Sequence, residues 1–212
     1  MTFVVLIAGV SGSGKSALAA ELAGAWRGRC APLCVDNYYR DLAHVPFEKR
    51  ALTNFDDPAA IDHEMAAHHL RALADGNGID TPVYSFATHT RTGEVMHVEP
   101  APVVVAEGIL ALHWPELRSI AELRVFVECP LELCLQRRIN RDTRERERTE
   151  ADVRRQFAEQ VEPMARRYVL PSARHADITV RGDGDLGEAL WAVMAEAALL
   201  PGGPALSAEE AP

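Results

Sequence analysis

The chain has 212 residues, of which 48% are hydrophobic and 25% are charged. This composition is typical of a folded globular protein and excludes wholesale disorder. Acidic residues outnumber basic ones by 31 to 22, for a net charge of −9. An acidic surface repels nucleic acid and anionic membranes, so we predict that neither is a partner and that any basic site is local.

The length of the apolar runs and the first residues of the chain indicate where in the cell the protein is located. No apolar run approaches the ~20 residues of a membrane span. The first residues show no basic leader and no small-residue cleavage site, so we expect a cytoplasmic protein.

Apolar runs typical of buried strands alternate along the chain with segments of helical periodicity. This alternation predicts an α/β fold in which helices flank a mostly parallel sheet. Asp57 is the expected cap of the second helix, with Pro58 as its first residue. The predicted strands cover residues 3–8, 33–35, 103–106, 123–127 and 178–180. The predicted helices cover residues 16–26, 58–73, 130–139, 149–161 and 186–200.

Between about residues 77 and 102 the pattern changes. Two alternating runs, 83–86 and 95–98, flank a polar stretch with Thr92-Gly93-Glu94. We interpret them as a β-hairpin inserted into the domain, a candidate lid or substrate wall. Residues 1–200 are expected to form one domain, and the aperiodic residues 201–212 a disordered tail.

Residues 9–16 match the pattern G-x-x-x-x-G-K-S, with an apolar strand before them and a helix after them. Glycines let successive backbone N–H groups turn inward and hold phosphate oxygens, and the first turn of the helix adds its positive end. A chance Gly/Ser turn is the alternative, but strand, loop and helix are in register. We therefore predict a site for a nucleoside triphosphate, with contacts from Gly9, Ser11, Gly12, Ser13, Gly14, Lys15 and Ser16.

Two carboxylates follow predicted strands at the edge where ligands of α/β sheets bind. Glu107 ends the strand 103–106, and Asp36 ends the strand 33–35. Each could be an ordinary turn residue that ends a strand. Their convergence on the edge with the phosphate loop favours a Mg²⁺ site that also includes the Ser16 hydroxyl.

Six arginines lie within the twelve residues 137–148, which form a candidate lid. A solvated helix balanced by Asp142, Glu145 and Glu147 is the simpler explanation. Planar guanidinium groups also suit phosphate oxygens, and mobile cations that close over a transferring phosphate are typical of kinases. Because the chain has no N-K-x-D motif for guanine and no basic face, we favour a small-molecule kinase over a GTPase switch or a nucleic-acid motor.

Further motifs follow in order along the chain. They are Asp36-Asn37-Tyr38-Tyr39-Arg40, Asn54-Phe55-Asp56-Asp57-Pro58, Pro82-Val83-Tyr84-Ser85-Phe86, His89-Thr90-Arg91, Glu107-Gly108-Ile109, the run from Arg137 to Arg148, Gln156-Phe157 and Val161-x-Pro163-Met164. With the phosphate loop they extend to about Arg181, and the ordered set resembles the uridine–cytidine kinase family of P-loop kinases.

The resemblance implies transfer of phosphate from ATP or GTP, with Mg²⁺, to the 5′-hydroxyl of uridine and cytidine, a step of pyrimidine salvage. Asp36 would take the proton of that hydroxyl. The other implied catalytic residues are Lys15, Arg141 and Arg146. The metal would lie on Ser16, Glu107 and Asp36, and Arg148 would contact the nucleotide.

The resemblance also implies a nucleoside site and a homotetramer. Asp56 and Arg138 would bind the ribose hydroxyls, with Tyr39 and Gln156 nearby. The base pocket would comprise Tyr84, Phe86 and His89. The alternative for these three is that the aromatic residues pack the hairpin onto the domain and that His89 is a loop histidine.

The chain departs from the family pattern at two positions, and two other functions stay open. Glu147 stands where the family has glycine between two lid arginines, and Asp57 where it has histidine. These departures bear on substrate choice and turnover. The alternative functions are a P-loop kinase for another small hydroxyl acceptor, such as another nucleoside, a pantothenate-like molecule or a sugar phosphate, and a nucleotide-dependent regulator without catalysis.

Overall fold

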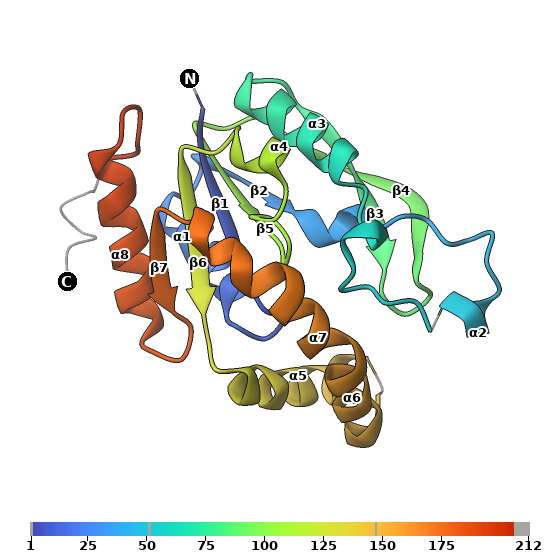
Figure 1. Cartoon of the computed structure of the whole chain (residues 1–212). Coiled ribbons are helices and arrows are strands. Elements are labelled where there is room, and N and C mark those ends of the chain that lie inside the picture. The colour runs from blue at the N-terminus through green and yellow to red at the C-terminus, as the bar shows by residue number, and fades with distance from the viewer. Residues whose placement is uncertain (1, 51, 147, 206–212) are drawn as a thin grey trace.

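The computed structural model of the protein describes residues 2–50, 52–146 and 148–205 (Figure 1). Its centre is a five-stranded sheet in which the strands follow the order β2-β5-β1-β6-β7. Every neighbouring pair of strands in this sheet runs parallel, which confirms the predicted α/β fold. The strands are β1 (Phe3–Gly9), β2 (Cys30–Cys34), β5 (Val103–Glu107), β6 (Leu123–Glu128) and β7 (Ile178–Arg181).

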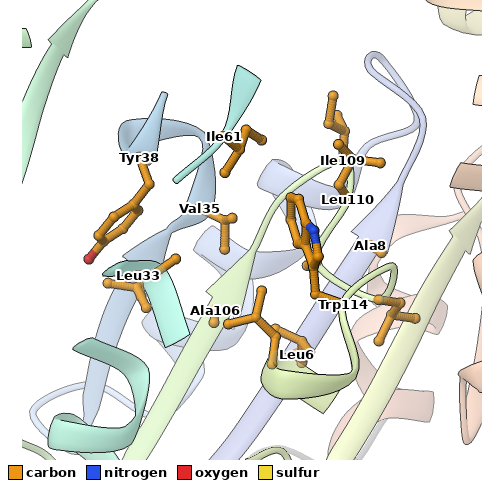
Figure 2. Packing of buried hydrophobic residues seen from close by; sticks show 14 of the residues in the cluster. Leu6, Ala8, Leu33, Val35, Tyr38, Ile61, Ala106, Ile109, Leu110 and Trp114 are labelled. Atoms are coloured by element: carbon orange, nitrogen blue, oxygen red, sulfur yellow. The ribbon is translucent and has the colours of Figure 1, made fainter. Parts of the chain in front are cut away.

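The central strand β1 is buried along its whole length, because its alternating side chains enter two separate cores. On one face, Phe3, Val5 and Ile7 pack with helices α1 (Lys15–Ala25) and α8 (Leu186–Leu199). On the other face, the core includes α3 (His63–Ala74) and residues 157–169. Figure 2 shows Leu6 and Ala8 within this second core. Close packing on both faces makes β1 a rigid support for the loop that follows it.

Six further helices lie between these elements. They are η1 (Val35–Tyr38), α2 (Phe47–Arg50), η2 (Pro58–Ala60), α4 (Pro115–Arg118), α5 (Leu131–Glu145) and α6 (Glu150–Gln156). In Figure 1 the sheet runs from top to bottom, and α5 lies beyond the carboxyl ends of its strands. Helix α5 continues past the predicted end at Ile139 to Glu145, and Arg141, Arg144 and Glu145 in this extension are strong helix formers.

The predicted helix start at Pro58 is wrong. Asp57 does act as a cap, accepting from the Ala59 amide at 2.8 Å, but it caps only the short 3-10 turn η2. The backbone then becomes extended at Ile61, which is buried and forms a β-bridge with Tyr39. Asp62 caps α3. Two successive capping aspartates thus divide what looked like one helix.

The predicted helix capped by Thr149 is confirmed, but it belongs to a much longer helical stretch that reaches His175. The stretch contains the π-helical turns η3 (Phe157–Val161) and η4 (Ala165–Val169), separated by α7 (Glu162–Met164), and ends in η5 (Leu170–His175). Its buried apolar residues recur every fourth position: Val153, Phe157, Val161, Ala165 and Val169. An α-helix of about 3.6 residues per turn drifts by about 40° at each such step, and wider π turns cancel that drift.

The predicted hairpin exists, but its second strand begins at Thr90 rather than at Val95. Strands β3 (Ile79–Ser85) and β4 (Thr90–Val98) pair antiparallel, and the chain turns at residues 86–89. Thr92-Gly93-Glu94 lies inside β4, where the pairing shifts between Pro82–Val95 and Tyr84–Arg91. Gly93 has φ of 84° there. Some β-bulges use a left-handed glycine just as turns do, so the glycine alone does not distinguish the two.

Among the described residues, no helix is both long enough and apolar enough to cross a membrane. Residues 201–205 contain no helix or strand, and the rest of the predicted tail, residues 206–212, lies outside the described residues. The assignment of residues 1–200 to one domain stays a prediction.

Candidate active site

Residues 9–16 form a tight loop between β1 and α1, as predicted. Gly12 and Gly14 have φ of 90° and 103°, in the left-handed region that disfavours side chains. A Cβ on Gly12 would lie 2.5 Å from the carbonyl oxygen of Cys134 on α5. The two glycines therefore allow the loop to curl and α5 to pack directly against it.

A pocket of about 210 Å³ opens beside this loop and collects positive charge. The Lys15 ammonium lies 3.9 Å from Glu107 Oε2, and its side chain is 7% exposed. The amino-terminal end of α1 adds a partial positive charge. The pocket can therefore receive a polyanion of phosphate size. It is lined by Gly12, Gly14, Lys15, Ser16, Ala17, Arg137, Arg138 and Arg141.

The two predicted carboxylates do meet at the carboxyl edge of the sheet. Glu107 ends β5 and accepts from the Ser16 hydroxyl at 3.1 Å. Asp36 lies in the turn η1, because β2 ends two residues before it rather than at it. A Cβ on Gly108 would lie 2.7 Å from that of Val35, so the glycine lets η1 come close to the end of β5.

The Asp36 carboxyl group has an unusual electrostatic environment. Burial, followed by the negative charges of Glu107 and Asp56, raises its pKa to about 6, against the opposing effects of Lys15 and the Ile109 amide. A carboxyl group with a pKa near neutrality is well suited to take a proton from a substrate.

The donor atoms at this edge suit Mg²⁺. Asp36 Oδ1 and Glu107 Oε2 are buried and have no hydrogen-bond partner among the described residues. Those residues contain no group of three metal-binding side chains of the His, Cys, Asp or Glu type. Mg²⁺ is commonly held by one or two carboxylates together with phosphate oxygens and water. Ser16, Glu107 and Asp36 therefore fit a metal ion that arrives with a bound triphosphate.

Asp56 and Arg138 are both buried, and the charge of Asp56 acts on the carboxyl group of Asp36. Burial raises the pKa of Asp56, while the charges of Arg138, Lys15 and Arg141 oppose that rise. Arg138 donates to the Ser11 hydroxyl at 2.9 Å and to Gln156 Oε1 at 3.0 Å. The guanidinium of Arg138 thus joins the phosphate loop to the predicted nucleoside site.

The predicted aromatic residues form one cluster next to Asp36. The ring of Tyr39 lies 5.2 Å from that of Tyr84 and 6.3 Å from that of Phe86. His89 is stacked on Phe55 with ring centres 4.7 Å apart. Tyr84 Oη is buried without a hydrogen-bond partner among the described residues. Phe55 also belongs to this cluster, since its ring lies against those of Tyr39 and His89. The motif analysis gave it no role, and the available signal was its position directly before Asp56.

The arginines of the lid divide between several surroundings. Arg141 lines the phosphate pocket, whereas the guanidinium of Arg146 lies 4.8 Å from the centre of the Phe86 ring. Arg148 donates to Gln156 Oε1 at 2.6 Å. Arg137 donates to the carbonyl oxygen of Gly182 at 2.8 Å, a contact that the sequence analysis missed. Glu147, one of the two departures from the family pattern, lies outside the described residues.

Asp142 is the most important residue that the sequence analysis missed. The sequence analysis names it only in the alternative of a solvated helix, as a counter-charge. In the structure it is fully buried and forms ion pairs with Arg138, Arg141, Arg146 and Arg148. The solvated-helix interpretation is therefore wrong for Asp142 and for the buried Arg138. The available signal was an acid four residues after one arginine and four before another.

A second pocket, of about 260 Å³, adjoins the phosphate loop on the side of α8. Arg137 and the Gly182 backbone form one wall of it. Its largely apolar, glycine-rich lining suits a flat ring system. The lining residues are Gly14, Ala17, Leu18, Val127, Arg137, Val180, Arg181, Gly182, Gly184, Leu186 and Ala189.

Residues 4–185 match the sequence model of the phosphoribulokinase/uridine kinase family. The chain belongs to this family. Among its relatives, the uridine kinase of Shewanella piezotolerans is 43% identical over 189 residues, which cover 85% of this chain and 88% of the relative. The uridine kinase of Vibrio cholerae is 40% identical over 186 residues, or 85% and 87% of the two chains.

Solved structures of the family have the same fold. Phosphoribulokinase from Rhodobacter spheroides is 13% identical, with a TM-score of 0.61 over 85% of this chain and 70% of the other. A possible uridine kinase from Bacillus stearothermophilus is 22% identical, with a TM-score of 0.51 over 84% and 88%. At these identities the likeness concerns the fold alone.

Proposed function

We propose that this protein transfers the terminal phosphate of a nucleoside triphosphate, ATP or GTP, to the 5′-hydroxyl of uridine and of cytidine. Membership of the family and relatives named uridine kinase at 40–43% identity support the proposal. The single observation that carries it is the environment of Asp36. The charges of Lys15 and Glu107, next to the phosphate loop, and of Asp56, the predicted ribose residue, all act on its buried carboxyl group.

In this proposal Asp36 is the general base. Its carboxylate takes the proton of the 5′-hydroxyl, the oxygen forms a bond to the terminal phosphorus, and the bond from that phosphorus to the bridging oxygen breaks. The nucleoside diphosphate leaves with the electron pair of the broken bond. Lys15 and Arg141 face the pocket in which charge spreads over the phosphate oxygens.

Mg²⁺, held by Ser16, Glu107 and Asp36, would neutralise charge on the outer phosphates. The Ser16–Glu107 hydrogen bond already places two of these oxygen ligands 3.1 Å apart. The Lys15 ammonium forms an ion pair with Glu107 at 3.9 Å, so these two charges are already paired before the nucleotide binds.

Recognition of the nucleoside is assigned to two groups of side chains. A carboxylate that accepts and a guanidinium that donates, such as Asp56 and Arg138, can bind the neighbouring hydroxyls of a ribose. The cluster of Tyr39, Tyr84 and Phe86 offers ring faces and edges to a pyrimidine. His89 is stacked on Phe55, so the base would pack beside that pair rather than between its two rings.

The 260 Å³ pocket beside the phosphate loop is our candidate site for the base of the donor nucleotide. Its apolar walls support purine binding but carry no feature that selects ATP over GTP. The cytoplasmic location and the homotetramer stay predictions.

A kinase for a different hydroxyl acceptor is the second candidate, because the family itself includes phosphoribulokinase. A coupled assay of nucleoside diphosphate release separates the two. We expect strong stimulation by uridine and cytidine and a basal rate with adenosine, with pantothenate or without an acceptor. Stimulation by adenosine or pantothenate alone would refute the pyrimidine assignment, and no stimulation by any acceptor would favour a non-catalytic regulator.

A further inference from the structure

The carboxylate of Asp142 is the only acid among the described residues that pairs with any of four lid arginines. Its oxygens lie 2.9 Å from Arg141 Nε, 3.5 Å from Arg138 Nε and 3.6 Å from a terminal nitrogen of both Arg146 and Arg148. The backbone amides of Arg146 and Arg148 also donate to the Asp142 carbonyl oxygen, each at 3.2 Å. One residue thus holds the end of α5 by both its side chain and its main chain.

Burial distinguishes this arrangement from an ordinary surface network. The Asp142 side chain is 0% exposed, whereas those of Arg141, Arg146 and Arg148 are 29–34% exposed. In the surface pair Arg154–Glu150 both side chains are more than half exposed. Taking an acid out of water is costly unless its partners compensate, so a fully buried acid marks a position where the partners' placement matters.

Three of the four arginines reach into different parts of the candidate active site, and Arg148 donates to Gln156 Oε1. Arg138 contacts the phosphate loop at Ser11, Arg141 lines the phosphate pocket, and Arg146 lies over Phe86. Asp142 therefore pairs with arginines that contact the phosphate side and with one that contacts the aromatic cluster. A shift of its carboxylate would move every one of these guanidinium groups.

The positive charges of the cluster outnumber its negative charge. Four guanidinium groups share one carboxylate, which leaves a formal excess of three positive charges. The arginines repel one another at short range, and the Asp142 charge reduces that repulsion. A bound triphosphate would supply the remaining negative charge.

We propose that Asp142 is a positioning residue, whose buried carboxylate gathers Arg138, Arg141, Arg146 and Arg148 into one cluster before the triphosphate binds. This inference rests on the proposed function. It assigns to Asp142 no contact with substrate. Its effect is on the geometry in which the arginines meet the transferring phosphate, where a misplacement of about 1 Å can cost about 10²-fold in rate.

The test compares Asp142→Asn and Asp142→Glu with the wild type. Asparagine removes the charge, and glutamate keeps it but displaces the oxygens by one methylene. Asp177→Asn is the matched control. Asp177 also forms an ion pair with an arginine, Arg124, at 2.7 Å, but this pair lies at the amino ends of β6 and β7, whereas the candidate active site lies at the carboxyl ends of the strands. The assay measures kcat with uridine, and titration calorimetry measures the affinity for a non-hydrolysable ATP analogue.

For both Asp142 variants we expect kcat to fall between about 10-fold and 10²-fold. In both variants the affinity for the ATP analogue should not weaken by more than about threefold. In Asp142→Asn it can become tighter, because the negative charge of the triphosphate replaces that of the lost carboxylate in the ground state. Asp177→Asn should keep the wild-type kcat. The inference is overturned by a kcat within about twofold of wild type in both variants, or by an equal loss in Asp177→Asn. If Asp142→Asn does not fold, Asp142→Glu decides.

Limited digestion with trypsin gives a readout that needs no acceptor. Without substrates, Asp142→Asn should be cut between residues 141 and 148 at least about tenfold faster than wild type, and the ATP analogue should protect both. Equal cleavage rates would overturn the inference. A wild type that is inactive with uridine would instead count against the proposed function, and the trypsin comparison would still decide the role of Asp142.

Discussion

Replacing Asp36 by asparagine separates the catalytic role of this residue from its effect on stability. The side chains have nearly the same shape, so the close approach of η1 to Gly108 is kept. Loss of a general base lowers kcat by about 10²–10⁴-fold, which corresponds to about 3–5 kcal/mol in the activation free energy. Asp36→Asn should therefore be nearly inactive while binding both substrates.

The same substitution should make the metal-free protein more stable. Burial and the neighbouring charges of Glu107 and Asp56 raise the pKa of Asp36 from 3.8 to about 6. Since the folded state holds this proton more tightly than the unfolded state, Asp36 opposes folding increasingly as the pH rises from about 4 to about 6. At pH 7 the cost amounts to about 3 kcal/mol, which Asp36→Asn would remove.

Two measurements with one control test this reasoning. Denaturant unfolding in the presence of EDTA should show a stability gain for Asp36→Asn at pH 7 that vanishes near pH 4. The coupled assay should show the loss of kcat. Asp75→Asn is the control, because Asp75 is exposed at the carboxyl end of α3, outside the candidate active site, and should keep kcat. A kcat for Asp36→Asn within about threefold of wild type would refute the general-base role, and a loss of stability at pH 7 would refute the electrostatic argument.

Three further substitutions test the nucleoside and phosphate sites. Asp56→Ala should raise the KM for uridine by about 10–10²-fold, because charged hydrogen bonds contribute about 1.5–3 kcal/mol. Its affinity for an ATP analogue, measured by calorimetry, should stay within about threefold of wild type, and an unchanged KM would exclude Asp56 from the ribose site. Tyr84→Phe should keep the melting temperature, since Tyr84 Oη has no protein partner among the described residues, but should raise the KM for uridine by about tenfold. A lower melting temperature with an unchanged KM would assign Tyr84 to packing. Gly12→Ala should abolish binding of the ATP analogue, because Gly12 has a φ of 90° and the new methyl group would lie 2.5 Å from the Cys134 carbonyl oxygen. Normal binding would show that nucleotide binding does not need this backbone conformation.

The parts of the fold that were predictable are those set by local rules. The apolar run that became β1, the glycine-rich loop and the start of α1 follow one another within a short segment, and the structure confirms all three. The convergence of Asp36 and Glu107 also followed from a general rule, because parallel strands end at a common edge.

The errors concern residues whose structural role depends on distant partners. Gly93 needs a left-handed backbone in a turn and in a bulge alike, and only the pairing of Pro82 with Val95 decides between them. Asp142 lies in a highly charged run, and nothing local distinguishes a solvated acid from one that four arginines enclose. Such residues are identified by tertiary packing, which the local pattern does not contain.

Transfer to one particular oxygen is the central claim, and it can be measured directly. The wild-type protein would be incubated with γ-labelled ATP and either uridine or 5′-deoxyuridine, and the labelled products identified by mass spectrometry. The account predicts labelled uridine 5′-monophosphate from uridine and no labelled nucleotide from 5′-deoxyuridine. Labelled product from 5′-deoxyuridine, or none from uridine, would contradict it.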